Sequence, residues 1–323
     1  MTTEKLKFPP LSIKGQGRNL THRVKTGQTL FSYMEKVIAQ YQSRGQHRTS
    51  ETYSSTLSSF RKYREGVDVR LKDLDSTLME AYEVHLRYLG LSPNTISFYL
   101  TRLRAVYYRA VDEGLVIDRH PFKRVNTSIE KTVKRAVSLQ VIKQLKALDL
   151  SHCPAKCFAR DMFLFSFYTR GMSFVDIAYL QKKNLKGNIL VYRRKKTNQQ
   201  LSIYWESCMQ EIVDRYGAAA NSPYLFSIIT SSSVEDSRRQ YLSVLCQINR
   251  YLKMMGKGLG LHQPLTMYCA RHSWASIAHE EGIPLSVISE GMGHDSEKTT
   301  QIYLASLKTE VIDKANREIL NLL

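Results

Sequence analysis

Hydrophobic residues recur at helical spacing four times in the first third of the chain. Leu30, Met34 and Ile38, for example, repeat every four residues and therefore share one stripe of a helix. The boundaries also have helical signals, since Ser92 followed by Pro93 is a typical helix start. We expect a four-helix bundle whose helices begin at Thr29, near Thr49–Ser50, near Asp75 and at Ser92, the last three ending by Gly66, Leu89 and Gly114.

Breaks in this pattern divide the chain into four parts. Pro9-Pro10 argues against a helix near the start, and His120-Pro121 ends the fourth helical pattern before a polar, charged run. A new helical pattern opens at Ser138, a good helix cap. We expect an N-terminal extension at 1–28, a helical domain at 29–114, a linker at 115–135 and a second domain at 136–323.

The second domain is predicted to be mainly helical with a small β-sheet. The segments ILVYRR and LSIYW, separated by a polar turn at Thr197–Gln199, predict a hairpin over Ile189–Tyr204. The fold class is therefore mainly α. Helices are expected after Ser138, at about 153–170, 173–181, 205–216 and 233–255, from Thr266 through His272, from Pro284, and in a short segment ending near Tyr303.

The composition is that of a folded, strongly basic protein. Hydrophobic residues make up 43% of the chain and charged residues 24%, which is enough to bury a core. No apolar run approaches the ~18 residues of a membrane span, and the start MTTEKLKFPP lacks the apolar stretch of a signal peptide. Lys and Arg number 47 against 29 Asp and Glu, a net charge of +18 that both halves share. This positive charge favours a polyanion, and nucleic acid is the commonest one.

Five scattered cysteines are typical of a reducing compartment, so we expect the cytoplasm and no disulfide framework. His152, Cys153 and Cys157 lie close together, but no second Cys/His pair follows at zinc-finger spacing, and we expect no metal. The sequence also lacks the glycine-rich loops that bind ATP or dinucleotides. No cofactor is expected.

Three stretches of the second domain carry side chains suited to phosphodiester chemistry. FYTRGMSFVDIAYL contains Arg170, ARHSWASIA contains Arg271, and GMGHDSEKTTQIYL contains His294 with Tyr303 nine residues later. Guanidinium groups bind both non-bridging oxygens of a phosphate and stabilise the charge that grows in the transition state. A tyrosine hydroxyl supplies a nucleophile for covalent catalysis.

These stretches resemble the signature of the tyrosine recombinases, also called phage-type integrases. Met292-Gly293-His294, Thr299-Thr300 and Tyr303 match the family's Leu/Met-Gly-His, its Thr-Thr pair and its tyrosine nine positions past the histidine. Arg271-His272-Ser273 matches the Arg-His-Ser/Thr helix of the family, and Lys196-Thr197 matches its hairpin lysine.

The resemblance implies a reaction and a role for each residue. Arg170 and Arg271 would bind the scissile phosphate, and Tyr303 would form a 3′-phosphotyrosyl link that frees a 5′-hydroxyl. Lys196, with Lys195 as the alternative, would give a proton to the departing 5′ oxygen. His294 would bond a phosphate oxygen or help move the tyrosine proton. The implied activity is site-specific recombination of DNA by integration, excision or inversion, without ATP or metal.

Two positions depart from the family pattern. Tyr268 stands three residues before Arg271, where the family has a histidine; a phenol can contact a phosphate, but its pKa near 10 makes it a poor proton shuttle. Ser173 stands three residues before Asp176, where the family has its first arginine, and Arg170 lies three residues further back. On a continuous helix these two positions share a face, whereas a turn between them would place the arginine differently. Asp176 is expected to orient an arginine or to cap a backbone group.

The resemblance also implies partners. Arg61, Arg102 and Arg109 in the first domain and Lys195 in the hairpin are expected to contact double-stranded DNA, with mere surface solvation as the alternative. The family acts as a homotetramer on two DNA sites, and accessory DNA-bending proteins are further candidates. The apolar stripe in VIDKANREILNLL, residues 311–323, would pack on a neighbouring subunit or on its own domain.

Two alternatives stay open beside recombination. One alternative is a DNA-binding regulator that has the same scaffold but no longer cleaves DNA. The departures from the family pattern at Tyr268 and Ser173 support this alternative. A type IB topoisomerase would use the same nucleophile but relax DNA at a single site. The resemblance itself covers about residues 29–310.

Overall fold

The computed structural model describes residues 27–130, 135–294, 296–301 and 320. The chain divides into two compact units, with the boundary between residues 132 and 133. Tyr303, almost all of the tail at 311–323 and the first 26 residues lie outside the described residues. Within the described ranges, no helix is both long and apolar enough to span a membrane. The fold is mainly α with one small sheet, which confirms the expected class.

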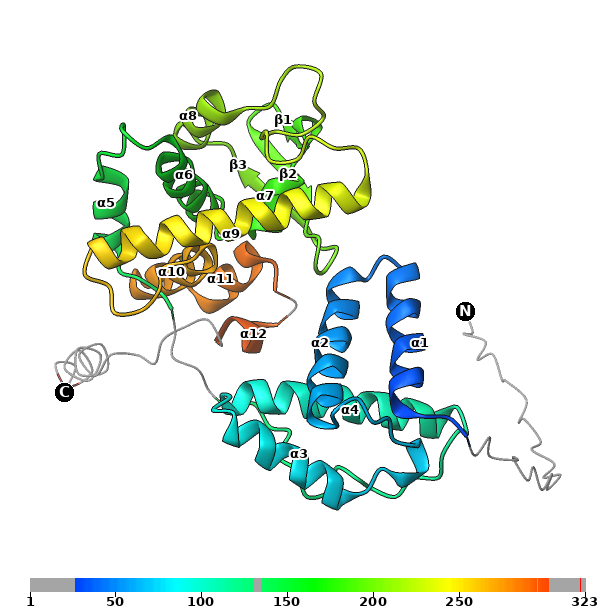
Figure 1. Ribbon diagram of the computed structural model, residues 1–323. Coiled ribbons are helices and arrows are strands. Elements are labelled where there is room, and N and C mark those ends of the chain that lie inside the picture. The colour runs from blue at the N-terminus through cyan, green and yellow to red at the C-terminus, as the bar shows by residue number, and fades with distance from the viewer. Residues whose placement is uncertain (1–26, 131–134, 295, 302–319, 321–323) are drawn as a thin grey trace, which may run out of the picture. The chain divides into compact units, whose positions relative to one another are not determined.

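The first unit is a helical bundle in which α1 packs along α2, and α4 packs against α2 and α3 (Figure 1). Its core contains Phe60, Tyr82 and Tyr107, all fully buried. The α3 helix starts where Asp75 accepts a hydrogen bond from the Leu78 N–H at 2.8 Å. The helices are α1 (Leu30–Ser43), α2 (His47–Tyr63), α3 (Ser76–Tyr88) and α4 (Pro93–Asp112), with a 3₁₀ turn at Leu71–Asp73.

Most of the expected linker at 115–135 is part of the first unit. Val116, Phe122 and Val125 are buried in the same core as the four helices. The Arg104 guanidinium on α4 also donates a hydrogen bond to the Thr127 hydroxyl at 2.6 Å. These apolar residues have no helical or strand spacing, so the pattern did not indicate that they were buried.

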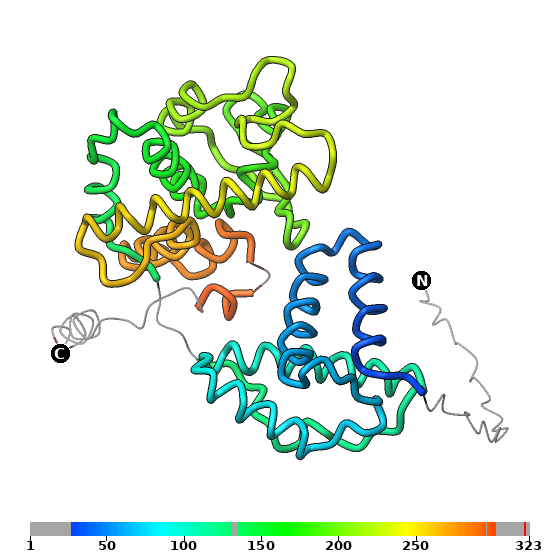
Figure 2. Tube along the Cα trace, in the orientation of Figure 1, coloured from blue at the N-terminus to red at the C-terminus, as the bar shows by residue number. Residues whose placement is uncertain are grey.

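The second unit surrounds α6 with other helices, and the long α9 crosses above α10 (Figures 1 and 2). Its sheet is antiparallel in the order β1-β2-β3, with Leu190 opposite Ile203 and Tyr192 opposite Leu201. The hairpin was therefore predicted correctly. The helices are α5 (Leu139–Ala147), α6 (Pro154–Tyr168), α7 (Phe174–Ala178), α8 (Ser207–Tyr216), α9 (Val234–Gly258), α10 (Met267–Glu280), α11 (Leu285–Met292) and α12 (Glu297–Gln301); the strands are β1 (Leu185–Lys186), β2 (Ile189–Arg193) and β3 (Gln200–Tyr204), and a 3₁₀ turn, η2, spans Lys182–Asn184.

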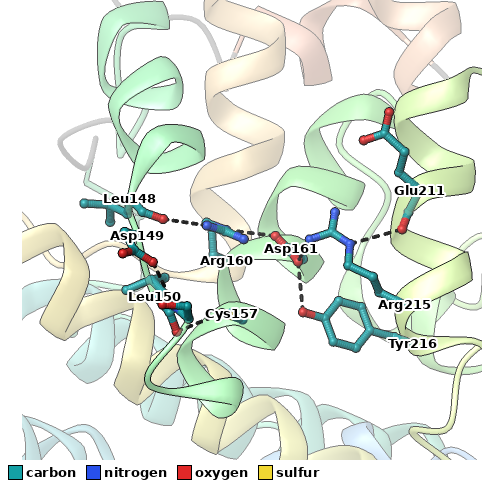
Figure 3. Close-up of polar contacts among 10 residues, drawn as sticks. Leu148, Asp149, Leu150, Cys157, Arg160, Asp161, Glu211, Arg215 and Tyr216 are labelled. Carbon is teal, nitrogen blue, oxygen red and sulfur yellow. Dashed lines mark hydrogen bonds and ion pairs between the residues drawn. The ribbon is translucent and has the colours of Figure 1, made fainter.

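A buried carboxylate ties α6 to α8 (Figure 3). Asp161 on α6, 1% exposed, accepts hydrogen bonds from Arg160 at 2.8 Å, Arg215 at 2.7 Å and Tyr216 at 2.9 Å. Burial and the neighbouring carboxylate raise the pKa of Tyr216 to about 12, so the phenol stays a donor. Arg160 also reaches the Leu148 carbonyl just after α5 at 2.7 Å. The network fixes α6 against α8.

Several helix boundaries differ by a few residues from the approximate ones expected. The helix expected at about 153–170 spans Pro154–Tyr168, because Arg170 enters the left-handed region and the chain turns there. The helix expected over 173–181 is only the five residues of α7. The second helix begins at His47, two residues before the expected start, and α9 continues to Gly258.

Candidate active site

Arg170 lies in the turn that ends α6. Its N–H donates to the Phe167 carbonyl at 3.2 Å, and the Gly171 N–H donates to the Ser166 carbonyl at 2.7 Å. This pair of bonds closes a helix in the Schellman arrangement, whose left-handed position is usually a glycine. Arg170 occupies that position with φ of 59°, which costs a side-chain-bearing residue about 1–2 kcal/mol. Such strain is concentrated at functional sites.

Arg271 on α10 joins this turn to the end of α11. The side chain is buried, at 3% exposure. One terminal nitrogen donates to the Gly171 carbonyl at 2.9 Å, and the other donates to the Met292 carbonyl at 2.6 Å and lies 2.9 Å from His294 Nε2. A Cβ at position 171 would lie 2.6 Å from the Arg271 Cα. Only glycine permits this approach.

His294 follows a second helix end of the same kind. The Gly293 N–H donates to the Glu290 carbonyl at 2.8 Å, and the His294 N–H donates to the Ser289 carbonyl at 2.9 Å. Gly293 has φ of 64°, in the left-handed region that favours glycine. The Gly-His dipeptide of the signature therefore has a conformational reason: the glycine reverses the chain and presents the imidazole.

The imidazole of His294 is neutral and its tautomer follows from its partners. A guanidinium only donates, so Nε2 accepts from Arg271, and Nδ1 carries the proton that it donates to the Thr300 hydroxyl at 2.8 Å. Burial, together with the charges of Arg271, Arg194 and Lys196, lowers the pKa of His294 to about 4.

The hairpin contributes a buried arginine that the sequence analysis did not single out. Arg194, 9% exposed, donates a hydrogen bond to the Gly293 carbonyl. Leu190, Tyr192 and Arg194 alternate on the buried face, so the period of two in the strand was the signal that could have separated this arginine from the rest of the run RRKK. Lys196 is exposed in the turn of the hairpin, and its charge acts on the nearby imidazole.

Segments far apart in the sequence thus meet at the end of α11. Burial raises the pKa of the Tyr192 phenol, and the negative charge of Asp176 raises it further. The positive charges of Arg271, Arg194 and Arg170 act in the opposite direction. All three guanidinium groups therefore lie near enough to this phenol to affect its pKa. The Arg170 side chain also passes α11, since its Cδ lies 3.7 Å from the place of a Cβ on Gly291.

The two departures from the family pattern have separate surroundings. Tyr268 is half exposed on the first turn of α10, with its ring edge-on to that of His272 at 4.8 Å. The Ser173 hydroxyl donates to Asp176 at 2.6 Å, and the other oxygen of Asp176 accepts from the Lys195 N–H at 2.7 Å. Asp176 therefore caps a backbone group, one of the two expected roles.

Two of the arginines expected to contact DNA have acidic neighbours. Arg61 lies 2.6 Å from Glu35, and Arg109 lies 3.0 Å from Glu113 and also donates to the Gln40 side chain. Exposed ion pairs of this kind contribute about 0–1 kcal/mol. They therefore hold the guanidinium groups in place without preventing exchange to another anion.

The other two cations expected to contact DNA lie on aromatic rings. The Arg102 guanidinium is 5.0 Å from the centre of the Phe98 ring. The Lys195 ammonium is 4.1 Å from the centre of the Tyr179 ring. Both contacts orient a cation without neutralising it.

The described part of the site can bind an anion and manage protons. Three guanidinium groups and one ammonium make this region positively charged, and a neutral imidazole lies near them. No cluster of three His, Cys, Asp or Glu side chains suited to a metal occurs within the described ranges. Tyr303, the expected nucleophile, lies outside them.

Comparison with known proteins gives matches along both units. Residues 29–131 match the phage integrase SAM-like domain, and residues 136–310 match the phage integrase family. Tyrosine recombinase XerA of Pyrococcus furiosus is 24% identical over 291 residues, covering 77% of this chain and 97% of that protein. Tyrosine recombinase XerC of Bacillus licheniformis is 25% identical over 272 residues, covering 78% of this chain and 83% of that protein.

Solved structures share the fold. A lambda integrase dimer bound to a COC′ core site has a TM-score of 0.65 at 17% identity, covering 89% of this chain and 81% of the integrase. The Tn1549 transposon integrase in complex with transposon right-end DNA has a TM-score of 0.64 at 16% identity, covering 91% and 99%. With both family matches, and with Arg271 and His294 of the signature in contact at the end of α11, the chain belongs to the phage integrase family, the tyrosine recombinases.

Proposed function

We propose that this protein is a site-specific recombinase that cleaves and rejoins double-stranded DNA through a 3′-phosphotyrosyl intermediate. The observation that carries the proposal is the convergence of Arg170, Arg194, Arg271 and His294 around the end of α11. Family membership supports it, since the relatives are tyrosine recombinases and the similar structures are integrases bound to DNA.

In the proposed reaction the guanidinium groups stabilise the charge that develops on the scissile phosphate. Arg170 is held in a strained turn and Arg271 by two backbone carbonyls, so neither has to reorganise during the reaction. Arg194 acts as a positioning residue, because it joins the hairpin to the carbonyl just before His294.

Protons move between the remaining groups. The Tyr303 hydroxyl forms the new bond to phosphorus, the bond to the 5′ oxygen breaks, and Lys196 gives that oxygen a proton. The Tyr303 proton passes to His294. The pKa of this imidazole is about 4 without substrate, and a bound phosphate anion offsets the surrounding positive charge and raises it. Substrate binding therefore makes the imidazole a competent base.

The assembly that we propose is a homotetramer on two DNA sites, acting in the cytoplasm, with accessory DNA-bending proteins as further partners. Structures of lambda integrase include a dimer on a core site and a tetramer on a Holliday junction. Two sites are required because a phosphotyrosyl end must be transferred to the 5′-hydroxyl of another strand for recombination.

The test is capture of the covalent intermediate. Target duplexes are selected from a random-sequence pool by binding to the full chain, and are then labelled and nicked near the cleavage point. After cleavage, the short fragment that carries the free 5′-hydroxyl diffuses away, so the covalent intermediate cannot be rejoined. The wild-type protein is expected to give an SDS-stable adduct, and Tyr303→Phe to bind the duplex without forming it.

The matched control is Tyr204→Phe, which alters an exposed tyrosine on β3 and should keep the adduct. A wild-type protein that binds its selected duplex but never forms an adduct would favour the DNA-binding regulator instead. An adduct that persists in Tyr303→Phe would assign the nucleophile to another residue.

A further inference from the structure

The side chains of the four consecutive cations RRKK in the hairpin have different surroundings. Arg194 is buried and donates to the Gly293 carbonyl, whereas the positive charge of Lys196 helps to lower the pKa of His294. Arg193 and Lys195 instead line a pocket of about 440 Å³ beside the sheet. Side-chain alternation at the end of β2 separates Arg193 from Arg194, and Lys195 and Lys196 lie in the turn that follows. Two cations are thus left unused by the proposed reaction.

This pocket carries a strong positive charge. Its basic lining residues come from neighbouring segments: Lys183 from η2, Lys186 from β1, Arg193 from β2 and Lys195 from the turn that follows it. Among the described residues that line it, the one carboxylate is Asp176, and both of its oxygens already accept hydrogen bonds. We call it the Lys183–Lys195 pocket.

The walls of the pocket are held in place by the fold. The Lys195 ammonium rests 4.1 Å from the centre of the Tyr179 ring, which is also part of the lining. The Asn184 side chain donates to the Val191 carbonyl at 2.9 Å, which ties η2 to β2. Arg193 donates to the Asn198 carbonyl at 3.0 Å. The cations are therefore presented by ordered backbone.

We propose that the Lys183–Lys195 pocket binds a phosphate group of the DNA backbone other than the scissile one. The inference rests on the proposed function, which supplies the DNA. Lys195 and Lys196 are neighbours with Cα atoms about 3.8 Å apart, so a phosphate in the pocket lies within a few nucleotides of the one at the catalytic cluster. Such a second contact would fix the register of the duplex on the enzyme.

Neutral phosphates test this contact directly. Methylphosphonates replace, one at a time, the backbone phosphates flanking the cleavage point of the selected duplex, and affinity is measured by fluorescence anisotropy with the full chain. At one or two positions the wild-type protein should lose about tenfold in affinity. The double variant Lys183→Gln/Lys186→Gln should bind unmodified duplex more weakly and lose no further affinity at those positions.

Salt dependence gives an independent readout. The slope of log affinity against log salt should become shallower by about 0.9 for each phosphate contact that the double variant loses. The matched control is Lys253→Gln, an exposed lysine on α9 that does not line the pocket, and it should keep the methylphosphonate pattern of the wild type.

Equal losses in wild type and double variant at every methylphosphonate position would overturn the proposal. Displacement of the duplex by millimolar inorganic phosphate in the wild type but not in the double variant, without any position-specific coupling, would assign the pocket to free phosphate and overturn it as well. Failure of the proposed function is separate, since it appears as a missing covalent adduct with the wild-type protein.

Discussion

At the scale of single residues, the central feature is a neutral histidine among cations. His294 contacts Arg271 directly, and Arg194 and Lys196 add to the positive charge around it. An imidazolium in this place would be repelled by all three. The ring therefore accepts from Arg271 through Nε2 and uses its one proton to bond Thr300.

The imidazole titration of His294 should have a midpoint near pH 4 rather than 6.5. Because the folded protein binds fewer protons than the unfolded chain between these values, stability should fall as the pH drops through this window. Arg194→Gln removes one of the opposing charges and should raise the midpoint, whereas Arg193→Gln should not. NMR of the ring protons, assigned with a His294 variant, measures both; a wild-type midpoint near 6.5 would contradict the geometry.

The choice between Lys196 and Lys195 as the acid can be decided by the leaving group. Lys196→Ala should slow adduct formation by about 10²–10⁴-fold, the usual range for a general acid. A 5′-bridging sulfur in place of oxygen leaves without a proton and should restore the rate of this variant. Lys195→Ala, whose ammonium rests on Tyr179, should show no such selective rescue. Rescue of Lys195→Ala alone would reverse the assignment.

At the scale of elements, two helix ends build the site. The turn after α6 and the turn after α11 are closed by the same pair of backbone bonds, and each presents a functional side chain. Arg271 and Arg194 donate to carbonyls at the end of α11, where the helix dipole is negative. The buried arginines and the C-terminal end of α11 thus stabilise each other.

Gly171→Ala should damage this arrangement more than an ordinary glycine substitution. Its φ is 76° and its Cβ would lie 2.6 Å from the Arg271 Cα, so we expect about 1–2 kcal/mol from the backbone conformation and about 1–3 kcal/mol from overpacking. Gly187 also has a positive φ, but a Cβ there would have no atom within 4 Å. Gly187→Ala should therefore lose only the contribution of the backbone conformation to the free energy of unfolding.

Urea unfolding followed by tryptophan fluorescence measures this difference. Trp205 and Trp274 are the two tryptophans of the chain, and both lie in the second unit, so the signal reports that unit alone. Equal losses in Gly171→Ala and Gly187→Ala would show that the close approach to Arg271 is not preserved in solution.

At the scale of the whole molecule, the charge of +18 is distributed over both units. The first unit supplies arginines in exposed ion pairs and on an aromatic ring, and the second supplies the arginines around His294 and the Lys183–Lys195 pocket. Contacts of both units with phosphates would add in the salt dependence of binding.

Binding of the full chain to its selected duplex should therefore depend steeply on salt. With six or more phosphate contacts, affinity should fall by about 10³-fold or more between 50 and 200 mM salt. Tyr303→Phe keeps every charge and should show the same slope. Anisotropy titrations give the slope, and a loss below about tenfold would mean that few phosphates are contacted.

Local pattern was enough for the existence of most helices and of the hairpin, and the resemblance to a known family added the signature residues. Helical spacing, Ser92-Pro93 and the alternation around Thr197 are properties of adjacent residues, so they can be identified before any folding. The motif residues Arg170, Arg271 and His294 were also identified in this way, since a reaction needs particular chemical groups. Tyr303 was identified as well, and it remains a prediction because it lies outside the described residues.

Tertiary structure decided what those residues do. Whether Arg170 continued a helix or entered a left-handed turn depended on the close packing of Gly171 against Arg271, 100 residues away. The run RRKK was divided between two sites by its contacts with Gly293 and Tyr179, and the segment after α4 joined the first core through Phe122. Contacts between distant segments carry no periodic signal along the chain, so only the folded structure reveals them.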